Sequence, residues 1–297
     1  MKQNGLLSLL FAVLLLSIAL SCTDHFPPDP LPNHQRIKSI TQILPGDDED
    51  TFVSDFTYHS ENKLRYIDSH PILPVIPGVP SGMTAHTSYG YNDDNHITGA
   101  QRTLAPFVGE VYTYDIDPTG LNRQLSNFNS GSNTYFMFFT YNGNQLESSR
   151  RTFKTSGISY EQKIMYFFAG NNLDNVDYET TLERNTTTVT KSKSEFTYDD
   201  KVNPFYGMPV IPASNVGLPS PSTGNFSHYT FAGGFESFMH LSRNNVLSEK
   251  SSTLSETTYS YTYNNDGLPL TRITMKKNTP QDQPQLVETL VFEYETF

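Results

Sequence analysis

The segment Phe139-Thr140-Tyr141-Asn142-Gly143-Asn144-Gln145-Leu146 decides the fold class of this 297-residue chain. Its two aromatic residues are two positions apart, a spacing that places both rings on one face of a β-strand. The Asn-Gly pair that follows is typical of a tight hairpin turn, and Leu146 resumes the apolar pattern beyond it. The segment therefore predicts a strand, a turn and a second strand.

The same aromatic pair recurs along the whole chain. The pairs are Phe56/Tyr58, Tyr89/Tyr91, Tyr112/Tyr114, Phe139/Tyr141, Tyr166/Phe168, Phe196/Tyr198, Tyr261/Tyr263 and Phe292/Tyr294. Helix is the weaker alternative, because no segment after Cys22 keeps an apolar spacing of three and four over several turns. We predict an all-β fold, an antiparallel meander of repeated β-hairpins that forms a strongly curled sheet or barrel, with the rings on its core face.

Composition limits the possible partners. The chain has 20 Lys and Arg against 31 Asp and Glu, a formal net charge of −11, so it has no basic surplus with which to bind nucleic acid. The single Cys excludes an intrachain disulfide framework and a four-Cys zinc site.

The first residues have the features of an export signal. Lys2 precedes an apolar run from Leu6 to Leu20, which is shorter than the roughly 20 apolar residues of a membrane-spanning helix. Ile18-Ala19-Leu20-Ser21-Cys22 resembles a bacterial lipobox, and this resemblance implies that the Cys22 thiol receives a lipid. Ala19 departs from the commonest pattern, which has Leu there. The alternative is a free cysteine at the end of an ordinary signal peptide.

These features divide the chain into three parts. We expect a lipoprotein signal peptide at 1–21, a Pro-rich tether at 22–35 and a single β-hairpin-repeat domain at 36–297. The tether contains Pro27, Pro28, Pro30 and Pro32, which favour an extended spacer. The predicted location is the outer membrane, on the periplasmic or the cell-surface side, with the membrane as a partner through the lipid anchor.

Two proline-rich segments interrupt the hairpin series, and both contain the tetrapeptide Pro-Val-Ile-Pro, at 74–77 and at 209–212. Long loops of this kind are often functional. Val75, Ile76, Val210 and Ile211 are therefore candidate contact or plug residues. In one hypothesis they close an open end of the β structure; in the other they form an exposed patch for a partner. Both hypotheses expect the two loops to lie close together at one end.

Two segments carry a family resemblance. Phe196-Thr-Tyr-Asp-Asp-Lys-Val-Asn-Pro-Phe-Tyr-Gly207 and Leu241-Ser-Arg-Asn-Asn-Val246 are similar to a pattern in uncharacterised Bacteroidota lipoproteins with a porin-like β fold. The resemblance implies an antiparallel sheet curled toward a barrel on a lipid anchor. Tyr261-Thr-Tyr-Asn-Asn-Asp-Gly-Leu268 is more loosely similar to the YD repeats of Rhs-type shells.

The end of the chain bears on membrane insertion. Phe297 is a C-terminal aromatic residue, as in many outer-membrane barrels. However, Leu290, Phe292 and Tyr294 share one face of the last strand, while Phe297 has the parity of Glu293 and Glu295. Two carboxylates on a lipid-facing stripe would be unfavourable. We therefore expect a domain that does not insert its strands into the bilayer.

Catalytic motifs are absent from the sequence. It has no HExxH, no P-loop, no GxSxG elbow and no dinucleotide fingerprint. Asp115-Ile-Asp-Pro-Thr-Gly120 imitates the start of a calcium loop, but position twelve would be Ser126, so a hairpin turn is the preferred interpretation. No catalytic residue, metal ligand or cofactor is assigned, and we expect a protein that is not an enzyme.

Three hypotheses of function remain. The first is an envelope-anchored structural or binding scaffold, with an envelope protein as partner. The second is a surface glycan-binding accessory protein of a polysaccharide-uptake system, which requires exposed coplanar rings. The third is a carrier of an apolar ligand inside the curled sheet, which requires an apolar interior.

Overall fold

A computed structural model of the chain describes residues 31–46, 51–60, 62–72, 84–105, 107–129, 135–155, 158–208 and 239–297. Its strands are β1 (Gln35–Ile43), β2 (Thr51–Tyr58), β3 (Leu64–Pro71), β4 (Thr84–Tyr91), β5 (Ile97–Ala105), β6 (Phe107–Ile116), β7 (Asn122–Asn129), β8 (Tyr135–Asn142), β9 (Gln145–Thr155), β10 (Ile158–Ala169), β11 (Asn172–Glu183), β12 (Thr187–Val202), β13 (Asn244–Ser251), β14 (Glu256–Tyr263), β15 (Pro269–Lys277) and β16 (Gln285–Thr296). Two single-turn helices, η1 (Pro32–His34) and η2 (Met239–Leu241), accompany them. Among the described residues, neither helix has the length and hydropathy of a membrane span.

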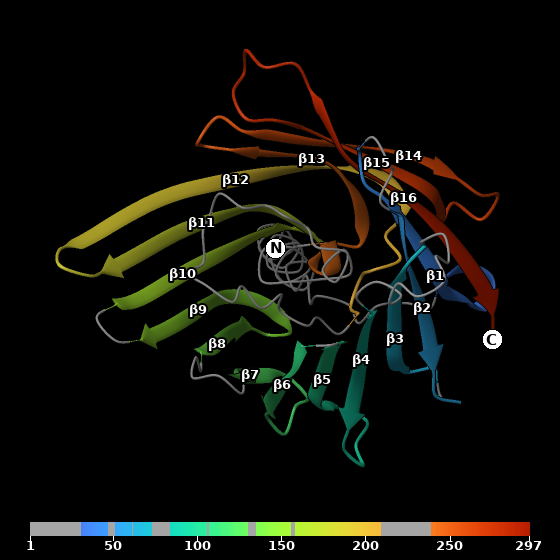
Figure 1. Cartoon of the computed structure of the whole chain (residues 1–297), viewed down its shortest axis with the longest axis horizontal. Helices are drawn as coiled ribbons and strands as arrows, with labels where there is room; N and C mark the ends of the chain where they lie inside the picture. Colours follow the sequence, from blue (N-terminus) through green and yellow to red (C-terminus); the bar gives the residue numbers. More distant parts are fainter. Residues whose placement is uncertain are drawn as a thin grey trace, which may run out of the picture.

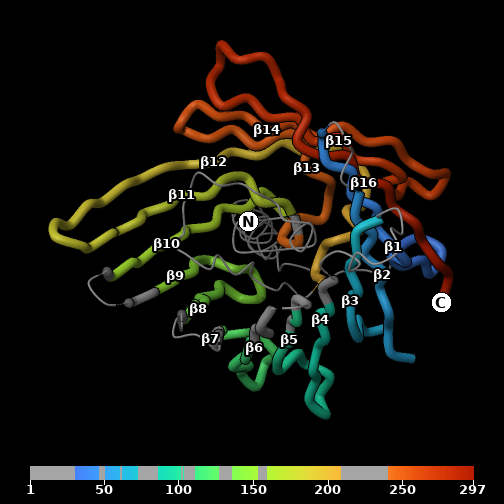
Figure 2. The backbone as a smooth tube through the Cα atoms, viewed as in Figure 1, coloured from blue at the N-terminus to red at the C-terminus, as the bar shows by residue number. Residues whose placement is uncertain are grey.

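The sixteen strands form one closed antiparallel barrel in which each strand pairs with its neighbours in sequence (Figure 1). The ring is completed by β1 and β16, which lie side by side at the two ends of the colour scale in Figure 2. The prediction of an all-β hairpin meander is confirmed. The structure further decides that the sheet closes.

The tight turns explain the Asn and Gly residues that follow the aromatic pairs. Asn62, Asn95, Gly120 and Gly267 each have a positive φ at the same place in four similar turns. Left-handed backbone favours Gly and Asn, because a Cβ atom is crowded there in most other residues. The β8–β9 and β10–β11 turns likewise use a glycine with positive φ.

A β-bulge recurs at the same position of every strand pair on the side of the barrel where these turns lie. One extra residue lies near the start of each odd-numbered strand; these residues are Lys38, Arg65, Thr98, Arg123, Glu147, Asp174, Leu247 and Leu270. A bulge shifts the register by one residue and strengthens the local twist. It therefore allows residues on both sides of the turn to point inward.

The inward face of the barrel forms the core. Its buried aromatic residues include Phe56, Tyr89, Tyr112, Tyr114, Tyr166, Phe196, Tyr259 and Phe292. Phe139 and Tyr141 are partly buried and pack against this cluster. The prediction that the repeated rings face the core is therefore confirmed, although the second ring of most pairs, as in Tyr58, Tyr91 and Tyr198, is only partly buried.

The last strand has the predicted parity. Leu290 and Phe292 are 0% and 3% exposed, whereas Phe297 is 44% exposed and Glu293 is exposed. The apolar stripe of β16 thus faces the barrel interior. Its outward face carries the carboxylate.

Candidate functional site

The residues predicted as sites all lie outside the described part of the chain: Cys22, Val75, Ile76, Val210 and Ile211. The strands that flank the two Pro-Val-Ile-Pro loops are described. In this antiparallel order, the connection from β3 to β4 leaves one end of the barrel and the connection from β12 to β13 leaves the other. The flanking strands thus give no support to the expectation that both loops cover the same end.

A buried charged network occupies the inner wall where β15, β16 and β1 meet. Arg272 Nη2 lies 2.6 Å from Glu288 Oε1, and both residues are 1% exposed. Gln42 Nε2 and Thr274 Oγ1 also donate to the Glu288 carboxylate. The Arg272 guanidinium lies over the Tyr259 ring, 5.5 Å from its centroid. A buried ion pair needs such additional partners, because removing two charges from water is unfavourable.

A second polar cluster lies on the inner wall of β9 and β10. Arg151 Nη2 donates to Tyr160 Oη at 3.2 Å and to Gln162 Oε1 at 3.1 Å. The Ser149 and Tyr166 hydroxyls form a buried hydrogen bond of 2.8 Å. The interior of the described barrel is therefore partly polar.

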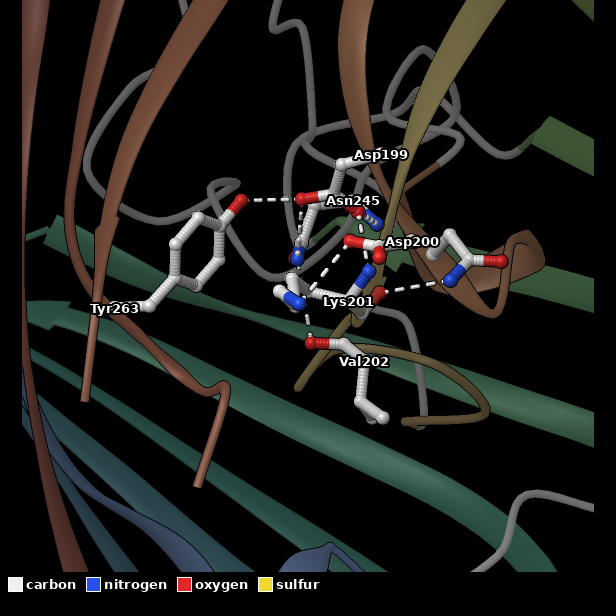
Figure 3. A network of polar contacts seen from close by, with 7 residues as sticks. Asp199, Asp200, Lys201, Val202, Asn245 and Tyr263 are labelled. Atoms are coloured by element: carbon white, nitrogen blue, oxygen red, sulfur yellow. Dashed lines mark hydrogen bonds and ion pairs between the residues drawn. The ribbon is translucent and has the colours of Figure 1, made fainter. Parts of the chain in front are cut away.

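The base of the long β12–β13 connection forms a third network, centred on Asp199 (Figure 3). The Asp199 carboxylate accepts from the Tyr263 hydroxyl, from both nitrogens of Asn245 and from the Lys201 amide. Burial and the adjacent Asp199 raise the pKa of Tyr263 well above its ordinary value. These bonds connect the end of β12 to β13 and β14.

At the same base, residues that precede the β12–β13 connection contact residues that follow it. Asn203 Nδ2 donates to the Ser242 carbonyl at 2.8 Å, and the Ser242 hydroxyl accepts from the Leu173 amide at 3.1 Å. Phe205 is 3% exposed and its ring lies 5.9 Å from that of Phe292. The two segments that carry the family resemblance, 196–207 and 241–246, thus come together to form this base.

Tyrosine hydroxyls connect neighbouring hairpins at the bulges. Each hydroxyl donates to the carbonyl of the residue just before a bulge. The pairs are Tyr58 to Ile37, Tyr91 to Leu64, Tyr198 to Leu173, Tyr261 to Val246 and Tyr294 to Pro269, at 2.6–3.0 Å. Burial raises the pKa of Tyr91 and of Tyr261 to about 12. These hydroxyls are therefore neutral donors at ordinary pH.

The Asp115–Gly120 segment forms the β6–β7 hairpin turn, as predicted. Asp117 accepts from the Thr119 hydroxyl and from the Leu121 amide, and Arg123 Nε donates to it at 2.6 Å. Hydrogen bonds to Thr119, Leu121 and Arg123 hold the pKa of Asp117 well below its usual range. Within the described ranges, no group of three or more His, Cys, Asp and Glu side chains could hold a metal ion.

The outer wall differs from one part of the barrel to another. Over β9 to β12 it carries cross-strand ion pairs, including Arg150–Glu161 at 3.5 Å and Lys191–Glu179 at 2.8 Å. On β8, the Phe136 and Phe138 rings point outward, 6.4 Å apart and 24° from parallel, and Phe136 is 38% exposed. The Arg150 guanidinium lies 4.9 Å from the Phe138 ring centroid.

The sequence prediction missed the buried ion pair and the Asp199 network. A signal for Glu288 was present, because it shares the parity of Leu290 and Phe292 on β16 and therefore points inward. No local signal identifies its partners, since Gln42 is 246 positions away in the sequence.

Comparisons with known proteins agree with the barrel. No protein-family model matches the chain, and no curated protein sequence matches it. Among solved structures, it is similar to a porin-like protein from Bacteroides uniformis, with a TM-score of 0.56 and 16% identity over 90% of this chain and 100% of that one. A porin-like protein from Bacteroides vulgatus matches with a TM-score of 0.39 and 11% identity, over 89% of this chain and 100% of that one. The first likeness shows a shared porin-like fold.

Proposed function

We propose that this protein is an envelope lipoprotein, anchored through a lipid on Cys22, whose barrel serves as a noncatalytic scaffold or binding platform. The observation that carries the proposal is the charged outer wall of β9 to β12. Ion pairs such as Lys191–Glu179 and Lys193–Glu195, each 2.8 Å long, are favourable in water and unfavourable against hydrocarbon. Such a barrel suits the aqueous side of a membrane and needs a separate anchor to stay there.

The buried polar groups support a structural role for the barrel interior. Arg272 and Glu288 neutralise each other, and Gln42 extends their contact to β1. The same groups disfavour the carrier hypothesis, because an apolar ligand would have to lie against charged and amide side chains. The proposal assigns no catalytic residue, metal or cofactor.

Fractionation tests the anchor. Cys22→Ala should release the protein from the membrane fraction into the soluble periplasmic fraction. The wild-type chain should incorporate a labelled fatty acid, and the variant should not. Unchanged membrane fractionation of the variant would contradict the proposal.

Glycan binding is the second candidate, and the outward pair Phe136 and Phe138 favours it. Near-parallel exposed rings can stack on the apolar faces of sugars, and Arg150 adds hydrogen-bond donors beside them. Affinity electrophoresis in gels that contain a polysaccharide tests this candidate. Phe136→Ala should abolish any retardation, whereas Met165→Ala, at an exposed site on β10, should leave it unchanged. Equal retardation of both variants would remove this candidate.

A further inference from the structure

The outer face of β14, β15, β16, β1 and β2 has an uncharged band. Strand pairing aligns its ten residues in two rows: Thr262, Thr271, Val291, Thr41 and Val53 in one, and Ser260, Ile273, Thr289, Ile43 and Thr51 in the other. They point outward, because the residues that alternate with them, such as Tyr261, Arg272, Phe292 and Gln42, are buried or pack against the core. We call these ten residues the outer band.

We propose that the outer band lies against the membrane surface when the chain is anchored; this rests on the proposed lipid at Cys22. Five strands at a spacing of about 4.8 Å make the band roughly 20 Å wide. It contains no charge that would lose its hydration on approach to a bilayer. The hydroxyl and methyl groups of the band tolerate the interface, whereas charged pairs would resist it.

The position of the anchor favours the outer band as the face that contacts the membrane. The N-terminal segment joins the barrel at β1, which belongs to the band, three strands from its β14 edge and one strand from its β2 edge. Cys22 and Leu31 are 31 − 22 = 9 residues apart, so the chain between them spans at most about 32 Å. Thr41 lies 41 − 35 = 6 residues beyond Gln35, which is about 20 Å along the strand. The bilayer can therefore reach the band within the length of the tether.

The opposite wall of the barrel is neither uncharged nor close to the anchored end of the chain. Strands β9 and β10 are about eight positions from β1 around the ring, a path of roughly 38 Å along the wall. Arg150, Glu161 and Lys163 form ion pairs there on the outer face. Turning this wall to the bilayer would require the tether to cross the barrel and the charges to lose water.

Charged pairs limit the band at its edge. Lys38 Nζ lies 3.3 Å from Glu293 Oε2, one row nearer to the chain termini, and both side chains are more than half exposed. The uncharged surface is thus small, and it would bind a bilayer weakly by itself. The lipid supplies the affinity by holding the wall at high effective concentration.

Site-directed fluorescence tests the orientation. The chain has one cysteine, whose thiol the lipid occupies, so an added cysteine is the single free thiol. The full lipidated protein, purified from membranes, is labelled at Ser260→Cys in the band, at Thr113→Cys on β6 or at Met165→Cys on β10, all three exposed outward positions. Each labelled protein is reconstituted into phosphatidylcholine vesicles with a headgroup nitroxide lipid as quencher.

The label at Ser260→Cys should be quenched severalfold more strongly than the other two. Equal quenching at the three sites, or the strongest quenching at Thr113→Cys or Met165→Cys, would overturn the orientation. A protected, unquenched Ser260→Cys label together with a crosslinked dimer would show that a second copy covers the band, which would also overturn it. Failure of the wild-type protein to float with vesicles would instead contradict the lipid anchor, so the two failures are distinguishable.

Discussion

The closing pair of strands, β16 and β1, can be compared with an ordinary hairpin such as β2 and β3. In the closing pair, Tyr294 is opposite Ile37 and Lys38 is the extra residue of the bulge. In the hairpin, Tyr58 is opposite Leu64 and Arg65 is the extra residue. The hairpin has a turn, closed by a 2.8 Å bond from the His59 amide to the Lys63 carbonyl, whereas no chain joins β16 to β1. The register and the bulge therefore do not depend on the turn.

At the closing pair, side-chain and backbone hydrogen bonds hold the two strands together in place of a turn. Arg36 Nε donates to Glu295 at 2.7 Å, and the Phe297 amide donates to the His34 carbonyl at 3.0 Å. Inside the wall, Gln42 of β1 donates to Glu288 of β16. No short loop reduces the entropic cost of bringing β1 and β16 together. The difference therefore shows that specific polar contacts stabilise barrel closure over this long sequence separation.

Alkaline pH should lower the free energy of unfolding through both regions, and this should be the largest of the predicted effects. Buried tyrosines bind their protons more tightly in the folded chain. Burial raises the pKa of Tyr294 and of Tyr58 well above an ordinary 10.0, and it raises the pKa of Tyr91, which donates to Leu64 of β3, to about 12. A raised pKa contributes stability that is complete below pH 10 and is lost as the pH rises toward 12. Urea unfolding at about pH 8 and about pH 11 should show a large fall in the free energy of unfolding. An unchanged value would contradict the burial of these hydroxyls.

Removal of the Glu288 charge should be the most damaging single substitution at the closing pair. Glu288→Gln leaves the buried Arg272 guanidinium without its counter-ion, and we expect a loss of about 4 kcal/mol in the free energy of unfolding. Glu293→Gln, on the outer face of the same strand, is the matched control and should change it by less than about 1 kcal/mol. Similar losses for both variants would show that the inner network has no special part in closure.

Truncation of the equivalent inner rings compares the two regions directly. Phe292 of the closing pair and Phe56 of the hairpin are 3% and 5% exposed and precede Tyr294 and Tyr58 by two residues. Phe292→Ala and Phe56→Ala should each lower the free energy of unfolding by about 3 kcal/mol or somewhat more, because each leaves a cavity. Chemical denaturation of the two variants measures this. A much larger loss for Phe292→Ala would mean that closure depends more on packing than the hairpin does.

Deletion of a single hydroxyl should have the smallest effect. Tyr58→Phe removes the donor to the Ile37 carbonyl at the closing pair, and Tyr91→Phe removes the donor to the Leu64 carbonyl at the hairpin. Each should lower the free energy of unfolding by about 1 kcal/mol. Hydrogen exchange of the β1 and β3 amides should report the local loosening. Faster exchange in neither variant would indicate that the bulge carbonyls do not need these donors.

Much of the fold could be predicted from local patterns. The spacing of Phe139 and Tyr141, the Asn-Gly turn and Leu146 define a hairpin within a few residues, since side-chain alternation and turn geometry are local properties. The inward direction of Leu290 and Phe292 follows from the same alternation. The candidate sites were less predictable: Asp199, Asn245 and Tyr263 belong to three strands, and their meeting depends on the register of β12 to β14.

The sequence by itself determined that the chain is made of hairpins with aromatic residues inward, because the period of two and the turn residues act over short distances. Tertiary structure alone decided that sixteen strands close, that β1 meets β16, and that Arg272, Glu288 and Gln42 share one buried network. The physical reason is that closure requires strand number, tilt and stagger to agree around the whole ring. No local segment contains that information, and each bulge adds only one part of the twist that brings the two ends together.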